Sequence, residues 1–118
     1  MLTALRTIAT AHCAAIFVQA ALAGRYLSGE FDAISIHNAN AGLVMLLGWA
    51  QALAAALLWR PGRGPAWPLA ASLLICVAEL MQIGAGRAHE LGLHVPLGVS
   101  LFGATATLTG WAWTARRA

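Results

Sequence analysis

Apolar residues fill four long segments of the chain, and short polar or breaker-rich stretches separate these segments. They run over about residues 5–27, 33–59, 67–87 and 91–114. Each is close to the roughly 20 residues that an α-helix needs to cross the hydrocarbon core of a bilayer. Three prolines and two glycines lie within residues 60–68, so no helix continues through that stretch. The pattern therefore predicts four membrane-spanning helices.

Composition agrees with this pattern. Of the 118 residues, 60% are hydrophobic and only 9% are charged. A soluble domain of this size could not bury so much apolar surface, so we expect the lipid bilayer to cover it. Because the connecting loops are short, the expected fold is a single all-α domain, an antiparallel four-helix bundle integral to the membrane.

The distribution of basic residues predicts the orientation. All seven are arginines, and they stand singly or in pairs at segment ends, a pattern that indicates membrane topology and not nucleic-acid binding. One side carries five of them: Arg6, Arg60, Arg63, Arg116 and Arg117. The same side carries four tryptophans: Trp59, Trp67, Trp111 and Trp113. We expect this side, with both termini, to be cytoplasmic. The arginine, alanine and glycine bias favours a bacterial source, and hence the inner membrane.

The two halves of the chain share a weak internal repeat. The first reads Gln19, Gly24-Arg25, Ile36-His37, Gly42 and a Gly-Trp-Ala at 48–50. The second reads Gln82, Gly86-Arg87, Leu93-His94, Gly98 and a Gly-Trp-Ala at 110–112. The order is kept although the spacing changes across the loops. Two such hairpins are related by a pseudo-two-fold axis along the membrane normal, which places His37 opposite His94 near the outer surface. Gln19 and Gln82 are expected to form hydrogen bonds between helices.

Two imidazoles that face each other across a bundle can ligate one metal ion from both sides. A haem fits this arrangement best, because four-helix bundles hold haem between facing helices and neutral imidazole is a common axial ligand. Gly42 and Gly98 follow the two histidines by about one turn and leave space for a flat ring. Arg25 and Arg87 lie near the outer surface, where they can pair with propionates. A closed zinc site would need four ligands, which the sequence does not gather.

His12 and Glu79 are ionisable residues deep within apolar segments, and the repeat pairs neither of them with an equivalent. Such groups usually face the protein interior and find partners. Four interpretations stay open. They are a direct contact between the two residues, a quinone or proton site, a second haem on His12, and plain hydrogen bonding to neighbouring polar groups.

The pattern resembles one four-helix half of the haem A synthase family. In that family an acidic outer loop precedes a histidine at the second helix, as Glu30 and Asp32 precede His37 here. A further histidine opens the fourth helix, as His94 does. The resemblance implies that His37 and His94 ligate haem b and that Glu30 supports the site. Only one such half is present, so the synthase activity is not implied.

The chain also resembles small four-helix bacterial membrane proteins. The shared sequence features are His12, the stretch VQAALAG at 18–24, Ile36-His37 and Leu93-His94. These features extend over nearly the whole chain, and they include the same histidine positions as in those proteins.

The resulting hypothesis is a membrane b-type cytochrome with one bis-histidine haem. With both axial positions filled, the iron transfers electrons, so the chain is more an electron-transfer protein than a stand-alone enzyme. A membrane quinone or a redox protein would be its partner, and oligomerisation stays open. The alternative is a non-catalytic subunit of a larger membrane complex in which the histidines are structural. A transporter or channel would require several copies.

Overall fold

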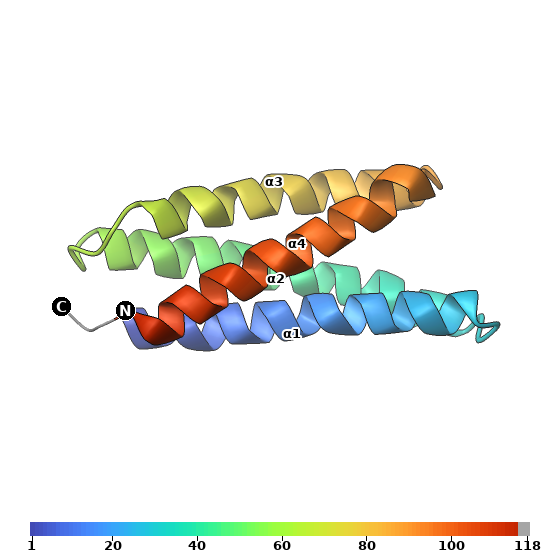
Figure 1. Ribbon diagram of the computed structural model, residues 1–118, viewed down its shortest axis with the longest axis horizontal. Helices are drawn as coiled ribbons and strands as arrows, with labels where there is room; N and C mark the ends of the chain where they lie inside the picture. Colours follow the sequence, from blue (N-terminus) through green and yellow to red (C-terminus); the bar gives the residue numbers. More distant parts are fainter. Residues whose placement is uncertain (116–118) are drawn as a thin grey trace.

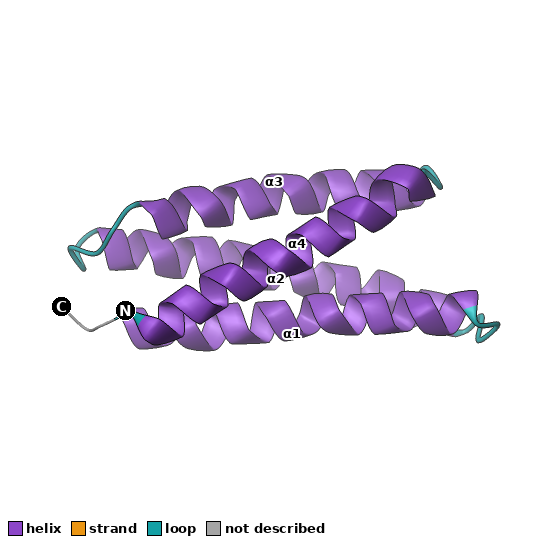
Figure 2. Cartoon of the chain, in the orientation of Figure 1, coloured by secondary structure: helices purple, strands orange, loops and turns teal. Residues whose placement is uncertain are grey.

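The computed structural model describes residues 1–115 and confirms the four predicted helices. They are α1 (Leu2–Leu27), α2 (Ala33–Trp59), α3 (Trp67–Arg87) and α4 (Leu91–Thr114), and the described residues contain no strand (Figures 1 and 2). Their bounds match the predicted spans, except that α1 begins three residues earlier. All four are long and apolar enough to cross a membrane. Arg116 and Arg117, which were predicted to lie on the cytoplasmic side, fall outside the described residues.

The helices form an antiparallel bundle in which each packs against two neighbours. Both α1 and α3 pack against α2 and α4. The pairs α1/α3 and α2/α4 therefore face each other diagonally across the bundle axis. In Figure 1, α4 crosses obliquely from the start of α1 toward the end of α3. The molecule is elongated, with extents of 49 × 20 × 19 Å.

Small side chains allow the helices to approach closely. The larger apolar cluster consists of Leu5, Ala9, Ala54, Ala55, Leu58, Leu108 and Ala112. Four of these seven residues are alanines, which is typical of packing between membrane helices. The large apolar residues Phe17, Leu46, Leu74 and Val99 are all more than 60% exposed. This outward apolar surface is consistent with a multi-pass membrane protein.

One end of the bundle gathers arginines and tryptophans, as the sequence predicted. The start of α1, the end of α4 and the loop of residues 60–66 lie at this end (Figure 1). Arg6 ties α1 to α4, because its Nε donates to Ala112 O at 2.8 Å and its Nη2 donates to Ala115 O at 2.8 Å. The indole rings of Trp67 and Trp111 meet edge to face, with centroids 4.6 Å apart.

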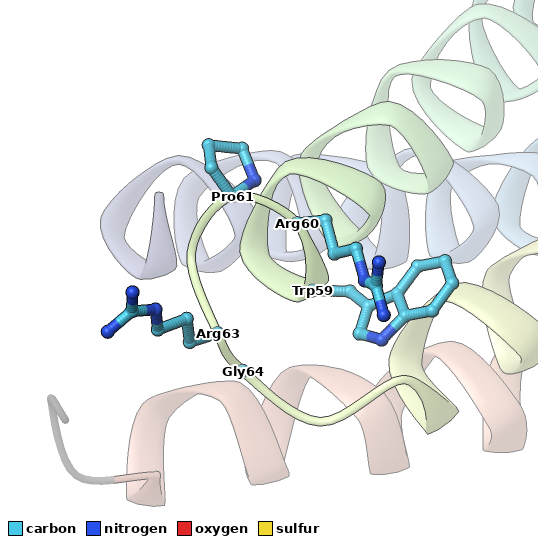
Figure 3. Close-up of a pocket in the computed structure, with 5 residues that line it drawn as sticks. All are labelled: Trp59, Arg60, Pro61, Arg63 and Gly64. Atoms are coloured by element: carbon cyan, nitrogen blue, oxygen red, sulfur yellow. The ribbon is translucent and has the colours of Figure 1, made fainter.

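The loop at this end borders an open hollow lined by Trp59, Arg60, Pro61, Arg63 and Gly64 (Figure 3). The Arg60 guanidinium lies 5.1 Å from the Trp59 ring centroid. A side chain at position 64 would collide with Leu58, because its Cβ would lie 2.8 Å from Cγ and 2.9 Å from the carbonyl oxygen of that residue. Glycine therefore lets the chain turn tightly before α3.

Candidate functional site

His37 and His94 face each other at the opposite end of the bundle, as the repeat predicted. His37 is the fifth residue of α2, and His94 is the fourth residue of α4. Their ring centroids are 6.2 Å apart, with 55° between the ring planes. Since α2 and α4 are diagonal helices, the two imidazoles meet across the bundle axis and not along a helix–helix seam.

Each imidazole is anchored through the same ring nitrogen. His37 Nδ1 lies 3.1 Å from Gln19 O, and His94 Nδ1 lies 2.9 Å from Gln82 O. A carbonyl oxygen only accepts, so each Nδ1 carries the hydrogen and donates it. In the neutral ring, Nε2 then keeps a free lone pair, and neither Nε2 forms a hydrogen bond within residues 1–115. Metal-ligating histidines typically donate their second ring N–H to a carbonyl in this way.

The separation of the rings suits one ion between them. Imidazole nitrogens lie about 2 Å from a bound metal ion, so two rings on opposite sides of one ion have centroids roughly 6 Å apart. The observed 6.2 Å agrees with this value. Residues 1–115 contain no group of three or more His, Cys, Asp or Glu side chains that could hold a metal ion. Two imidazole donors alone do not complete a closed protein site, which typically needs four ligands.

The residues around His37 form a hydrogen-bonded support. Gln19 Nε2 donates to His37 O at 2.9 Å, which confirms the predicted bond from this glutamine to another helix. Asn40 Nδ2 donates to Gln19 Oε1 at 2.7 Å and to Ala15 O at 2.9 Å. Sequence reasoning missed Asn40, although it lies three residues after His37 and hence on the same helix face.

The support around His94 is less complete. Gln82 Oε1 is buried and forms no hydrogen bond among the described residues, so the bond between helices that was expected of this side chain is not observed. Gly98 lies against this amide, because a Cβ there would be 2.9 Å from Gln82 Nε2. Gly86 lies against the imidazole itself, and a Cβ there would be 2.8 Å from His94 Cε1. Gly86 therefore determines how closely His94 approaches α3.

Gly42 does not share the histidine face. It is exposed, and a Cβ there would have no neighbour within 4 Å. Five residues of α-helix rotate the backbone by about 140° from the direction of His37, which explains the difference from the expectation. Of the two glycines expected beside the rings, Gly98 faces the Gln82 side chain of α3 and Gly42 faces outward.

The two outer arginines lie on the surface of the same end. Arg25 donates to Glu30 Oε2 through Nε at 2.9 Å and through Nη2 at 2.5 Å, and both side chains are more than half exposed. Arg87 is exposed at the end of α3. Neither guanidinium contacts His37 or His94 in the described structure.

A second diagonal pair lies deeper in the bundle, between α1 and α3. His12 Nε2 is 2.6 Å from Glu79 Oε1. This distance confirms the direct contact between the two residues, which was one of the four interpretations. His12 Nδ1 is 3.0 Å from Gln51 Oε1, and Gln51 Nε2 donates to Ser72 Oγ at 3.2 Å. All four side chains are at most 2% exposed. No pattern along the chain connects Gln51 and Ser72 with this pair.

No family model, curated protein or solved structure matches this chain.

Proposed function

We propose that this chain is a membrane b-type cytochrome that binds one haem between His37 and His94. The observation that carries the proposal is the pair of imidazoles across the bundle axis. Each Nδ1–H is held by a backbone carbonyl, and each Nε2 is left without a partner. The separation of 6.2 Å between the ring centroids agrees with one ion ligated from both sides.

The chain's own residues hold and orient the ligands. The carbonyls of Gln19 and Gln82 fix the plane and tautomer of each ring, and this bond makes Nε2 a stronger donor to a metal. Gly86 leaves space for the His94 ring. A bound haem would supply one-electron transfer, and His37 and His94 would hold it.

The equivalent anchors support the predicted internal repeat. Gln19 and Gln82 correspond in the two hairpins, as do His37 and His94, and the same carbonyl-to-Nδ1 bond occurs in both. The resemblance to one half of the haem A synthase family leads to the same two ligands. Both arguments support a single haem with pseudo-two-fold symmetry.

The charge distribution supports a haem near the extracytoplasmic surface of a bacterial inner membrane. Arg6, Arg60 and Arg63 lie at the end that we assign to the cytoplasm. Glu30 and Glu90 lie at the other end, next to the helices that carry the paired histidines. A quinone or a redox protein on the outer side would then exchange electrons with the haem.

Single histidine variants test the proposal. We expect the purified protein to contain about one haem per chain, and we expect His37→Ala and His94→Ala each to lose it or to change its spectrum from low spin to high spin. His89→Ala is the control, because the side chain of that exposed loop histidine bonds only to Arg87 O at the end of α3. If both single variants keep the unmodified spectrum and haem content, the two residues are not the ligands.

Two alanine substitutions at glycines of α3, one of them a control, test the geometry of the site. Gly86→Ala places a methyl group 2.8 Å from His94 Cε1, so it should displace the ring and weaken haem binding. Gly84→Ala, on the same helix, has no neighbour within 4 Å and should leave the spectrum unchanged. Equal spectra for the two variants would contradict the assigned position of His94.

A further inference from the structure

The deep pair of His12 and Glu79 lies apart from the paired histidines of the outer end. Gln19, whose carbonyl anchors His37, follows His12 by seven positions, so the two sites are about 10 Å apart along α1. His12 is 0% exposed and Glu79 is 2% exposed. The site therefore lies near the middle of the bundle, where a membrane would be driest.

The hydrogen bonds of this site determine which atoms carry protons. Ser72 Oγ donates its single hydrogen to Pro68 O at 2.7 Å. It must therefore accept from Gln51, which places the Gln51 amide nitrogen toward Ser72 and the amide oxygen toward His12. That oxygen accepts from His12 Nδ1–H. His12 Nε2 then faces Glu79 Oε1, and one proton lies between these two atoms.

The second oxygen of Glu79 is free to accept another proton. Glu79 Oε2 is buried and forms no hydrogen bond among the described residues. It points at Gly48 of α2, where a Cβ would lie only 2.5 Å away. Gly48 thus leaves the space in which this carboxyl oxygen sits. Glu79 Oε2 is therefore the one oxygen of this carboxyl group that remains available as an acceptor for a further proton.

Few other ionisable groups face this site. His12 comes from α1, and on α2 Gly48 and Gln51 supply the facing positions, with no ionisable residue between His37 and the end of that helix. On α3 the Cys76 thiol lies one turn before Glu79. On α4 no ionisable residue follows His94. Within residues 1–115, protonation here is therefore governed mainly by His12 and Glu79.

Packing alone does not require a charged pair at this position. The internal repeat aligns His12 with Ile75 and Glu79 with Ile16, and both isoleucines are buried. The fold thus accommodates apolar side chains at the equivalent places of the other hairpin. Buried ionic pairs are often no more stabilising than hydrophobic residues of similar volume, and ionisable groups within membrane segments typically serve a function.

We propose that Glu79 and His12 form a proton-binding site in the middle of the bundle. One proton is held between His12 Nε2 and Glu79 Oε1, which leaves the pair neutral. A second proton from water binds at Glu79 Oε2 and makes the pair singly positive. Gln51 and Ser72 are positioning residues, because they fix the tautomer that presents Nε2 to Glu79. The site does not depend on the presence of haem.

Isotope-edited infrared spectroscopy tests the proposal directly. The chain has only three glutamates, Glu30, Glu79 and Glu90. The double variant Glu30→Gln, Glu90→Gln, labelled with ¹³C-carboxyl glutamate and reconstituted in vesicles, reports on Glu79 alone without altering the site. We expect its carboxyl and carboxylate bands to interconvert as the pH is changed between about 4 and 9. Bands that stay constant over this range would overturn the proposal.

Two alanine substitutions at serines, one of them a control, test whether Ser72 and Gln51 position the His12–Glu79 pair. Ser72→Ala removes the acceptor of the Gln51 amide and should move the Glu79 titration midpoint by at least about one pH unit, a tenfold change in proton affinity. Ser100→Ala is the control, because Ser100 makes the same bond to a proline carbonyl four residues earlier but is exposed. Equal midpoints in the two variants would overturn the positioning role of Ser72 and Gln51.

Discussion

Gly48→Ala is the substitution whose effect follows most directly from the coordinates. The new methyl group would lie 2.5 Å from Glu79 Oε2 and 3.3 Å from both Cδ and Oε1. The carboxyl group must shift, and a shift that displaces Oε1 lengthens its 2.6 Å bond to His12. The variant therefore combines overpacking with the loss of a buried hydrogen bond.

The expected cost can be estimated from these two effects. Overpacking a core typically costs about 1–3 kcal/mol. A hydrogen bond between membrane helices contributes about 0.6–1.7 kcal/mol. Alanine stabilises a helix by about 1 kcal/mol relative to glycine, which offsets part of this cost. We therefore expect Gly48→Ala to lower the free energy of unfolding by about 1–4 kcal/mol.

Gly42→Ala on the same helix is the matched control. That position is exposed and has no neighbour within 4 Å, so the variant should be unchanged or up to about 1 kcal/mol more stable. Reversible unfolding in mixed micelles with increasing SDS, followed by circular dichroism, measures both free energies. If Gly48→Ala is as stable as Gly42→Ala, Glu79 does not pack against Gly48, and the geometry of the deep site is wrong.

Three further predictions concern the ends of the bundle. Asn40→Ala should lower the free energy of unfolding by about 1 kcal/mol in the same SDS assay, because Gln19 Oε1 and Ala15 O lose their donor. Arg6→Gln should lower the free energy of unfolding by about 1–3 kcal/mol, because the Arg6 guanidinium donates to carbonyl oxygens at the end of α4. It should also increase hydrogen exchange at that end of the helix. Glu30→Gln should leave the unfolding transition unchanged, since its pair with Arg25 is exposed, and a clear loss of stability would show that this loop is more than a surface connection.

The helices were predictable because their signals are local. Long apolar runs define the spans, and the proline- and glycine-rich stretch at 60–68 determines where α2 ends and α3 begins. The facing of His37 and His94 was also predictable, because a repeat with preserved order relates one hairpin to the other. The distance between their rings and the role of each ring nitrogen required the three-dimensional structure.

The errors and omissions concern which side of a helix a residue occupies. Gly42 was expected beside His37, but a spacing of five residues turns it toward the outside, whereas Asn40 at a spacing of three lies on the inner face. In helices that are apolar on every side, hydrophobic periodicity gives little information about the inner face. Glycines are equally ambiguous, since Gly48 and Gly86 contact side chains from other helices while Gly84 contacts none.

The deep site shows a related limit of sequence reasoning. His12 and Glu79 stood out because ionisable residues are rare within spanning segments. Their contact was one of several interpretations, since nothing in the order of residues brings α1 and α3 together across the axis. Gln51 and Ser72 become meaningful only when the bundle places them next to His12.

The most direct test of the central proposal is the absorption spectrum of the detergent-purified protein, recorded oxidised and then after reduction with dithionite. A haem held by His37 and His94 predicts a Soret band and, on reduction, the sharp, resolved visible bands of low-spin six-coordinate iron. If the protein, expressed with added haem, shows no Soret band, or only the bands of a high-spin iron with one histidine ligand, the bis-histidine account is contradicted.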